Sequence, residues 1–428
     1  MPPRPTKRRG EAPAPTEEPP SKKGTSKKGS SKEGEEESEG QEERPGEGPE
    51  GSAKPQKKGL HVIIVGSSGG PYEDETSCIL VRSTASQWRE KTVLAIDAGT
   101  LLGGIRNVLD TSEDAPFADL ITNGDSSLSN ALHIFQNIVG PICITHPHMD
   151  HIAGFVINTQ ALQKTSSPKT IACLQSVVDA LRQYVFNGVL WPNLTDEKGA
   201  GLVTFHTLPE GGNIMMGSGD LVGYEELAEK VLVKCYKVTH GECAQMYDPT
   251  ARRWRRRSSV HPQMMREAEK AVAQETEEER TESSAFFVRD KVTGKEVIVF
   301  GDIEPDSISA KQWNKRIWEE AARAFVAGRL KAIFIECSFT DDIQDEFLYG
   351  HLCPRHLGAE LDMLASCIDP RPEADRTNAL KGLNVYLTHI KVMDDVCVQN
   401  ILKQVRQRCS HLGCKVEVAA RGKSYYFA

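Results

Sequence analysis

The sequence predicts a layered α/β protein, and three observations lead to that prediction. Short, β-branched apolar runs recur from Leu60 onward, as strands require. Segments with apolar residues at helical spacing lie between these runs, and glycine-rich or polar turns separate the two kinds of segment. Because strands and helices mix along the whole length, with hairpins among them, separate all-helical and all-strand domains are not expected.

The first 58 residues differ from the rest of the chain. Nearly all of them are Pro, Gly, Ser, Lys or Glu, and apart from a few alanines no apolar side chain could anchor a core. This composition predicts a disordered tail over residues 1–58 and a folded domain over 59–428. A basic run at residues 7–9 has the character of a nuclear-import signal, but a solvated tail is the favoured interpretation.

The elements expected in the first part of the domain lead up to a histidine-rich loop. Predicted strands cover residues 61–65, 78–81, 92–96 and 141–145. A helix is expected over residues 129–138, capped by Ser129 or Asn130, and another is expected from Ile152 onward. The glycine-rich stretch from Ser67 to Pro71 lacks the lysine and spacing of a P-loop, and we interpret it as a loop near the site.

The second part of the domain repeats the mixture of strands and helices. Predicted strands cover residues 231–238, 285–289, 297–300, 332–336 and 385–387. Predicted helices cover residues 306–327, 356–366 and 394–406. Each apolar run is short enough for a strand, and each helical segment is long enough for several turns.

A charged insertion at about residues 242–282 interrupts this pattern. Its periodicity is weak, and a solvated helix over residues 262–279 is one interpretation. Five arginines surround Trp254, so the segment could bind nucleic acid or present Ser258 and Ser259 to a basophilic kinase. A plain exposed loop is favoured, because charge runs usually lie on solvated surfaces.

The composition of the whole chain limits its function class. Its formal net charge of −8 disfavours a general nucleic-acid binder, so no nucleic-acid partner is expected. The 11 cysteines show no disulfide spacing, which favours a reducing compartment, the cytoplasm or also the nucleus. No apolar stretch reaches the length of a membrane span, and the N-terminus has no apolar signal segment, so neither a membrane nor secretion is expected.

The most informative stretch is the H-x-H-x-D-H pattern at residues 146–151. It supplies His146, His148, Asp150 and His151 between a predicted strand and a predicted helix. Imidazole and carboxylate are ligands that suit zinc and related ions. A single histidine would more often be a satisfied core residue, but four ordered ligands at one strand end favour a metal site.

This pattern resembles the metal-binding motif of the metallo-β-lactamase superfamily. The fuller text at residues 144–155 is similar to the class II cyclic-nucleotide phosphodiesterases within it. Further similar segments are residues 93–100, 131–135, 283–288, 300–306, 335–338, 349–352 and 387–390. The resemblance runs from about Leu60 to the C-terminus and leaves out the tail and the arginine-rich insertion. Met149 in place of leucine and the long insertion after His240 are departures that touch no ligand.

The resemblance implies an αββα sandwich of the metallo-β-lactamase type, usually dimeric, with metals held at one edge. Carried over residue by residue, His146, His148 and His240 would hold one ion. Asp150, His151 and His389 would hold a second ion, and Asp302 would bridge the two. Zinc fits these ligands well, and manganese, iron and magnesium remain open.

Two cations would make a shared water acidic, and the resulting hydroxide would attack phosphorus opposite O3′ of a 3′,5′-cyclic nucleotide. A 5′-monophosphate would result. Besides Asp150 and Asp302, we expect His351 to act as general acid or phosphate contact, with Glu336 orienting it. A purely structural role for that pair is only somewhat less favoured.

The leading hypothesis is therefore a cyclic-nucleotide phosphodiesterase acting on cAMP, with cGMP open. One alternative is another phosphodiesterase of the superfamily, such as a tRNA 3′-end endonuclease, which the acidic chain disfavours. The other is a non-catalytic sensor of cyclic nucleotides, which would have no need to keep seven ligands.

Overall fold

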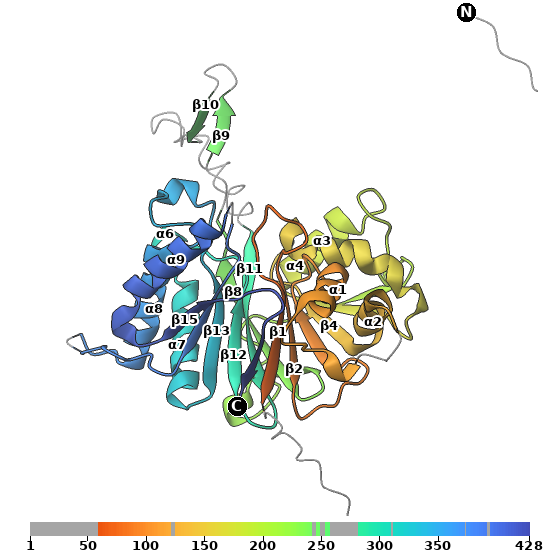
Figure 1. The fold of residues 1–428 in the computed structure, drawn as a ribbon, viewed down its shortest axis with the longest axis horizontal. Coiled ribbons are helices and arrows are strands. Elements are labelled where there is room, and N and C mark those ends of the chain that lie inside the picture. The colour runs from red at the N-terminus through yellow and green to blue at the C-terminus, as the bar shows by residue number, and fades with distance from the viewer. Residues whose placement is uncertain are drawn as a thin grey trace, which may run out of the picture. The chain divides into compact units, whose positions relative to one another are not determined.

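The computed structural model describes residues 59–120, 125–241, 245–248, 253–256, 281–309, 311–372, 374–391 and 394–428. The tail predicted over residues 1–58, the helix predicted over residues 262–279, and both Ser258 and Ser259 lie outside these residues. The described elements form two large sheets with helices on their outer faces (Figure 1).

The first sheet has seven strands in the order β16-β1-β2-β3-β4-β5-β6. They are β1 (Leu60–Gly66), β2 (Cys78–Ser83), β3 (Val93–Ile96), β4 (Val139–Cys143), β5 (Lys169–Cys173), β6 (Val203–Thr207) and β16 (Ser424–Phe427). Pairing is antiparallel from β16 to β3 and parallel from β3 to β6. Every residue of β1 is buried, because this strand is covered on both faces.

The second sheet also has seven strands, in the order β15-β14-β13-β12-β11-β8-β7. They are β7 (Glu225–Ala228), β8 (Val231–Thr239), β11 (Glu282–Asp290), β12 (Glu296–Phe300), β13 (Leu330–Glu336), β14 (Asn384–Thr388) and β15 (Lys415–Val418). The strands from β12 to β15 are parallel, whereas β7, β8, β11 and β12 pair antiparallel. Since β8 and β12 both pair antiparallel with β11, they point the same way.

Helices cover the outer face of each sheet (Figure 1). Those of the first sheet are α1 (Leu102–Thr111), α2 (Ser127–His133), α3 (Met149–Asn158) and α4 (Gln175–Ala180). Those of the second are α6 (Asp306–Ser309), α7 (Trp313–Val326), α8 (Pro354–Ile368) and α9 (Asp395–Arg408). Short helical turns are η1 (Ala118–Leu120), η2 (Ile134–Ile138), η3 (Thr159–Lys164), η4 (Leu181–Val185), η5 (Gly219–Leu221), η6 (Asp345–Phe347) and η7 (Ser410–Leu412). The arrangement is the αββα sandwich that the sequence predicted.

The alternation of side chains along β11 shows how the layers hold together. Phe286 and Val288 belong to the core that the second sheet shares with the first, whereas Ala285 and Phe287 belong to the core under α7, α8 and α9. Successive residues of a strand point to opposite faces, so one strand serves both cores. Burying a phenylalanine side chain contributes about 2–3 kcal/mol, which makes both faces strongly specified.

One predicted helix is wrong in its extent. Instead of running over residues 306–327, the helical segment breaks into α6 and α7, and Gln312 between them has φ of 53°. The side chain of Asp306 accepts hydrogen bonds from the backbone N–H groups of Asn314 (3.1 Å) and Lys315 (2.9 Å). Asp306 therefore satisfies the free donors at the start of α7 instead of beginning one continuous helix.

The helix predicted over residues 129–138 is also changed at both ends. Its cap is Ser126, whose hydroxyl accepts from the backbone N–H of Ser129 at 3.2 Å, and not Ser129 or Asn130. At the other end the helix widens into the π-helical turn η2, and β4 begins directly afterwards. The buried ammonium of Lys169 donates to the carbonyls of Phe135 (2.9 Å) and Val139 (2.6 Å), which stabilises this junction.

The arginine-rich segment is not a plain loop where it is described. Strand β10 (Arg253–Arg256) pairs antiparallel with β9 (Gln245–Asp248). The sequence analysis assigned Glu282 to the insertion, but this residue is the first of β11. None of the described helices is long and apolar enough to cross a membrane.

Candidate metal centre

The predicted ligands gather at one edge of the sandwich because of the direction of the strands. His240 follows β8, Asp302 follows β12 and His389 follows β14, and these three strands run parallel to one another. Carboxyl ends of parallel strands meet at the same sheet edge, which is the usual place for sites in α/β folds. The fourth contribution comes from the first sheet, where β4 leads into the loop that carries His146.

The H-x-H-x-D-H loop joins β4 to α3. His148 stands at the N-cap of α3, and Asp150 and His151 lie in its first turn. The partial positive charge of a helix N-terminus favours the carboxylate of Asp150 in that position. His148 is exposed, whereas His146 and His151 are buried, so the loop presents ligands from the protein interior to its surface.

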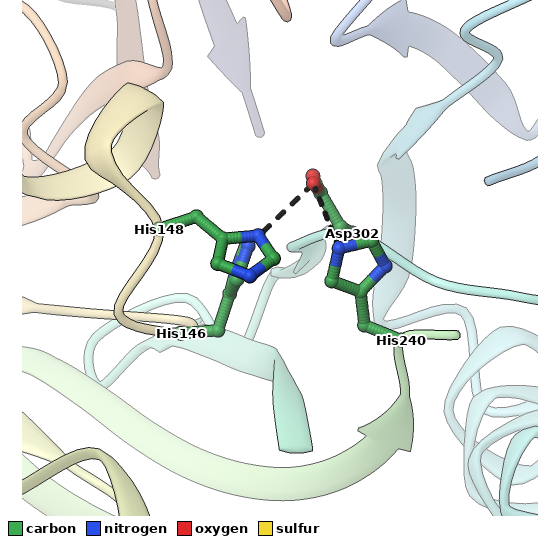
Figure 2. A group of neighbouring side chains, drawn as sticks. All are labelled: His146, His148, His240 and Asp302. Atoms are coloured by element: carbon green, nitrogen blue, oxygen red, sulfur yellow. Dashed lines mark ion pairs between the residues drawn. The ribbon is translucent and has the colours of Figure 1, made fainter. Parts of the chain in front are cut away.

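Asp302 lies at the centre of the cluster. Its Oδ2 is 3.5 Å from Nε2 of His146 and 3.8 Å from Nε2 of His240 (Figure 2). Its Oδ1 is 3.2 Å from Nε2 of both His151 and His389. Each carboxylate oxygen therefore faces a different pair of imidazoles.

Three groups of possible ligands result among the described residues, with the ligand atoms of each group lying within 4.8 Å of one another. The first group is His146, His148, His240 and Asp302. The second group is Asp150, His151, Asp302 and His389, and the third is Glu336, His351 and His389. The first two are the sets that the resemblance implied, and Asp302 belongs to both.

Several buried atoms in the cluster have no hydrogen-bond partner of normal geometry in the described part of the chain. They are Nε2 of His146, Nε2 of His151 and Oδ1 of Asp302. Leaving such groups buried and unpaired is costly, and divalent cations would satisfy all of them. The donor set and its geometry fit divalent metal binding.

The second nitrogen of each buried imidazole is held by another part of the protein. The Nδ1 contacts are His151 with Oδ2 of Asp97 (2.8 Å), His146 with Oγ1 of Thr145 (3.1 Å), His240 with the carbonyl of Gly350 (3.0 Å) and His389 with Oγ of Ser338 (3.2 Å). Such contacts fix the ring orientation and tautomer, so that Nε2 faces the centre.

Asp97 is a residue that the sequence analysis did not assign to the site. It has φ of 57°, and its Oδ1 accepts from the backbone N–H (2.8 Å) and the hydroxyl (3.0 Å) of Thr145. It thus fixes both the start of the histidine loop and the ring of His151. The available signal was its place directly after β3, within a segment of the family resemblance.

Glu336 and His351 lie next to the centre, as expected from the sequence. Nδ1 of His351 is 3.0 Å from Oε1 of Glu336 and 3.7 Å from Oδ2 of Asp302. Glu336 also accepts hydrogen bonds from the backbone N–H of Ile303 (2.7 Å) and the hydroxyl of Ser338 (2.6 Å). This fully buried carboxylate therefore connects the loops that carry Asp302, His351 and His389.

Burial and mutual charge determine the protonation states of the cluster. Burial lowers the pKa of His146 well below its ordinary value and also lowers that of His240. His148 is more exposed, but partial loss of hydration beside the other rings and the neighbouring His240 lower its pKa to about 4. Burial alone would raise the pKa of Asp302 and of Asp150, but neighbouring histidines hold both well below the usual range. Neutral imidazoles and ionised carboxylates are the forms that bind metal ions.

His151 differs from the other histidines of the cluster, and His351 beside the cluster shares its protonation with Glu336. Burial would lower the pKa of His151, but the carboxylates of Asp302 and Asp97 raise it well above its ordinary value. Burial lowers the pKa of His351 to about 4 and raises that of Glu336 to about 7, so this pair avoids an isolated buried charge.

Close backbone approaches bring the parts of the site together. A side chain at Gly301 would collide with Thr145, because its Cβ would lie 2.4 Å from that residue's Cβ. The loop from Ser67 to Pro71 lies beside the centre as predicted, since the backbone N–H of His389 donates to the carbonyl of Ser67 at 2.6 Å. A Cβ at Gly69 would lie 2.6 Å from Nδ1 of His389.

The chain is similar to known proteins over most of its length. A 3′,5′-cyclic-nucleotide phosphodiesterase from Schizosaccharomyces pombe is 28% identical over 378 residues, covering 86% of this chain and 92% of the relative. 3′,5′-Cyclic-nucleotide phosphodiesterase 1 from Saccharomyces cerevisiae is 25% identical over 385 residues, covering 78% of this chain and 88% of the relative.

The fold is shared with solved structures. Unliganded yeast PDE1 superposes with a TM-score of 0.64 at 23% identity, covering 86% of this chain and 100% of that chain. The αββα sandwich expected from the sequence is thus the fold of that solved structure as well. The family model of class-II cAMP phosphodiesterases matches residues 69–422. This chain therefore belongs to the class-II cAMP phosphodiesterase family.

Proposed function

We propose that this protein hydrolyses 3′,5′-cyclic nucleotides to 5′-monophosphates at a site that holds two divalent cations, with zinc as the expected ion. The observation that carries the proposal is the position of Asp302, whose two carboxylate oxygens face different imidazole pairs. The relatives from Schizosaccharomyces pombe and Saccharomyces cerevisiae, both named as 3′,5′-cyclic-nucleotide phosphodiesterases, support the substrate class. Both cAMP and cGMP are candidate substrates.

The ligand assignment follows the two groups that share Asp302. His146, His148 and His240 would hold one cation, and Asp150, His151 and His389 would hold the other. Asp302 would be shared by both. Two cations bound there would acidify water to yield a nucleophile and would neutralise negative charge on the phosphoryl oxygens.

The chain's own groups orient the reaction. Water attacks phosphorus in line with the P–O3′ bond, that bond breaks, and O3′ accepts a proton as it leaves. His351 is placed to give that proton, because its ring lies 5.2 Å from the ring of His389 and 4.9 Å from that of His240. Glu336 orients the ring through Nδ1 at 3.0 Å.

The proton for the leaving oxygen would have to come through the pair of Glu336 and His351 together. Burial places the pKa of Glu336 at about 7 and that of His351 at about 4, so near neutral pH the pair holds about one proton or none. Negative charge developing on O3′ would favour an imidazolium at His351, since its positive charge would lie between O3′ and Glu336. General acids of this kind typically contribute about 10²–10⁴-fold in rate.

The direct experiment is to purify the protein without chelator, measure its metal content, and identify the products from cAMP, cGMP and a tRNA precursor. We expect about two zinc ions per chain, as the two ligand groups require, and 5′-monophosphates as products. Cleavage of the tRNA precursor without turnover of a cyclic nucleotide would contradict the proposal. Binding of a cyclic nucleotide without turnover would instead identify a sensor.

Substitution tests the roles of the ligands. Asp302→Ala and His148→Ala should abolish turnover and lower the metal content, because both residues face the cluster. His411→Ala is the matched control, since His411 is an exposed histidine that pairs with Asp362 far along the chain. Full activity in a metal-depleted Asp302→Ala protein would refute the mechanism.

Other expectations from the sequence stay predictions. A homodimer can be checked by light scattering, and a cytoplasmic or also nuclear location by imaging of the tagged chain. Phosphorylation at Ser258 or Ser259 can be checked by mass spectrometry after treatment with a basophilic kinase. The domain boundary near residue 58 can be checked by limited proteolysis.

A further inference from the structure

Lys391 lies beside the metal centre, two residues after the ligand His389. Its backbone N–H donates to the carbonyl of Ser338 at 3.1 Å, and its Nζ donates to the carbonyl of Gly69 at 3.2 Å. Ser338 and Gly69 both lie against the imidazole of His389 at its Nδ1. The backbone of Lys391 and its ammonium are therefore anchored to two different loops, and both loops contact His389.

Among the described residues, no acidic side chain neutralises the positive charge of Lys391. No carboxylate in the described part of the chain forms an ion pair with it, and its Nζ contact is with a neutral carbonyl. Lys291 and Lys415 differ, because each pairs with a glutamate, at 2.6 Å and 2.7 Å. Lys391 is also only half-buried, so it can be reached from outside.

The ammonium also lies near the proposed general acid. Burial is the main cause that lowers the pKa of His351, and the charge of Lys391 lowers it further. Lys391 is thus anchored beside the loops that contact His389, and its charge is also felt at His351. An unpaired cation in that position has an anion as its natural partner.

We propose that Lys391 binds a non-bridging phosphoryl oxygen of the substrate and of the 5′-monophosphate product. This inference rests on the proposed function, and it adds a phosphate-binding residue that is not a metal ligand. A lysine ammonium acts as a compact point charge toward phosphate. Because phosphoryl oxygens gain negative charge during the displacement, the contact stabilises the transition state as well as the bound substrate.

A purely structural role for Lys391 makes a different prediction. If its only task were to hold Gly69 near His389, replacement would loosen the loop and lower the metal content and the melting temperature. The affinity for phosphate would then fall only in proportion to the loss of bound metal. The two roles are therefore separated by measuring anion binding on fully metal-loaded protein.

The experiment compares the wild type with Lys391→Met, Lys391→Arg and the surface control Lys415→Met, all loaded with zinc. Inorganic phosphate binding is measured by calorimetry, and KM, kcat and product inhibition are measured with cAMP. We expect Lys391→Met to weaken phosphate binding and raise KM by about 10- to 100-fold, as for loss of one hydrogen bond to a charged group. We expect Lys391→Arg to recover part of both, and Lys415→Met to match the wild type.

The inference is overturned if metal-loaded Lys391→Met binds inorganic phosphate as tightly as the wild type. It is also overturned if the whole loss of affinity follows from lost zinc. Failure of the proposed function has a separate signature, because a wild type that binds phosphate but leaves cyclic nucleotides intact would refute that proposal. In that case the phosphate titrations would still decide the role of Lys391.

Discussion

Replacing Asp97 by asparagine tests whether the residues behind the metal ligands determine metal affinity. Oδ2 of Asp97 lies 2.8 Å from Nδ1 of His151, and the carboxylate is buried. Asparagine has nearly the same shape and tolerates the positive φ of 57° at this position, so the backbone is not strained. The substitution therefore removes mainly the negative charge that orients and polarises His151.

The expected magnitude follows from the kind of hydrogen bond that is lost. A bond to a charged group contributes about 1.5–3 kcal/mol and a neutral one about 1 kcal/mol, and the amide must also serve Thr145. Changes to residues that orient metal ligands typically cost about 10- to 100-fold in metal affinity, or about 1.4–2.7 kcal/mol. We expect zinc affinity, measured by competition with a chelating dye, to fall within that range.

Asp290→Asn is the matched control. Asp290 is a fully buried carboxylate that accepts from the backbone N–H (2.7 Å) and hydroxyl (2.6 Å) of Thr293, at the sheet edge opposite the ligands. It should lower the melting temperature without changing zinc affinity. Unchanged zinc affinity in Asp97→Asn, or an equal loss in both variants, would refute the reasoning.

Three further predictions concern the surroundings of the site and its stability. Gly69→Ala should lower zinc content by displacing His389, because its Cβ would lie 2.6 Å from the ring, whereas Gly103→Ala, where the nearest atom is 4.0 Å away, should keep full zinc content on metal analysis; equal zinc in both would contradict this. Chelation of the metal should lower the melting temperature, because the folded state loses the free energy of metal binding. The lost stability would be about 2.7 kcal/mol if the free metal stood at 100 times its Kd, and an unchanged melting curve would argue against binding to the folded state. Burial lowers the pKa of Lys169 from 10.5 to about 8, so the unfolded chain binds more protons between these values and stability rises with pH there. Relative to Lys169→Met, the wild type should gain at most about 3 kcal/mol in urea unfolding between pH 8 and pH 10.5, and a flat difference would refute the assignment.

The candidate ligands that the structure brings together could be identified from the sequence because their signal is local. The H-x-H-x-D-H motif places four of them in six positions, and His240, Asp302 and His389 each follow a recognisable apolar run. Short-range patterns of this kind can be recognised without knowledge of the tertiary structure. The strands that carry the ligands were predicted for the same reason.

The residues that hold the ligands in place could not be derived in this way. Ser338 follows β13 and contacts His389, which follows the neighbouring strand β14. Gly350 holds His240 through a backbone carbonyl, which any residue type could supply. The helix break at Gln312 likewise depends on the carboxylate of Asp306 reaching forward to the backbone of α7. These contacts form only once the chain has folded, so no local pattern of residues predicts them.

The distribution of the ligands between the two sheets has a consequence for how the protein matures. His146, His148, Asp150 and His151 come from the first sheet's side, and His240, Asp302 and His389 come from the second. Any ion bound in either group would therefore be held by residues from both sheets and would link the two sheets to each other. A half-formed molecule would offer only fragments of each site, so tight metal capture would report that both halves have docked correctly.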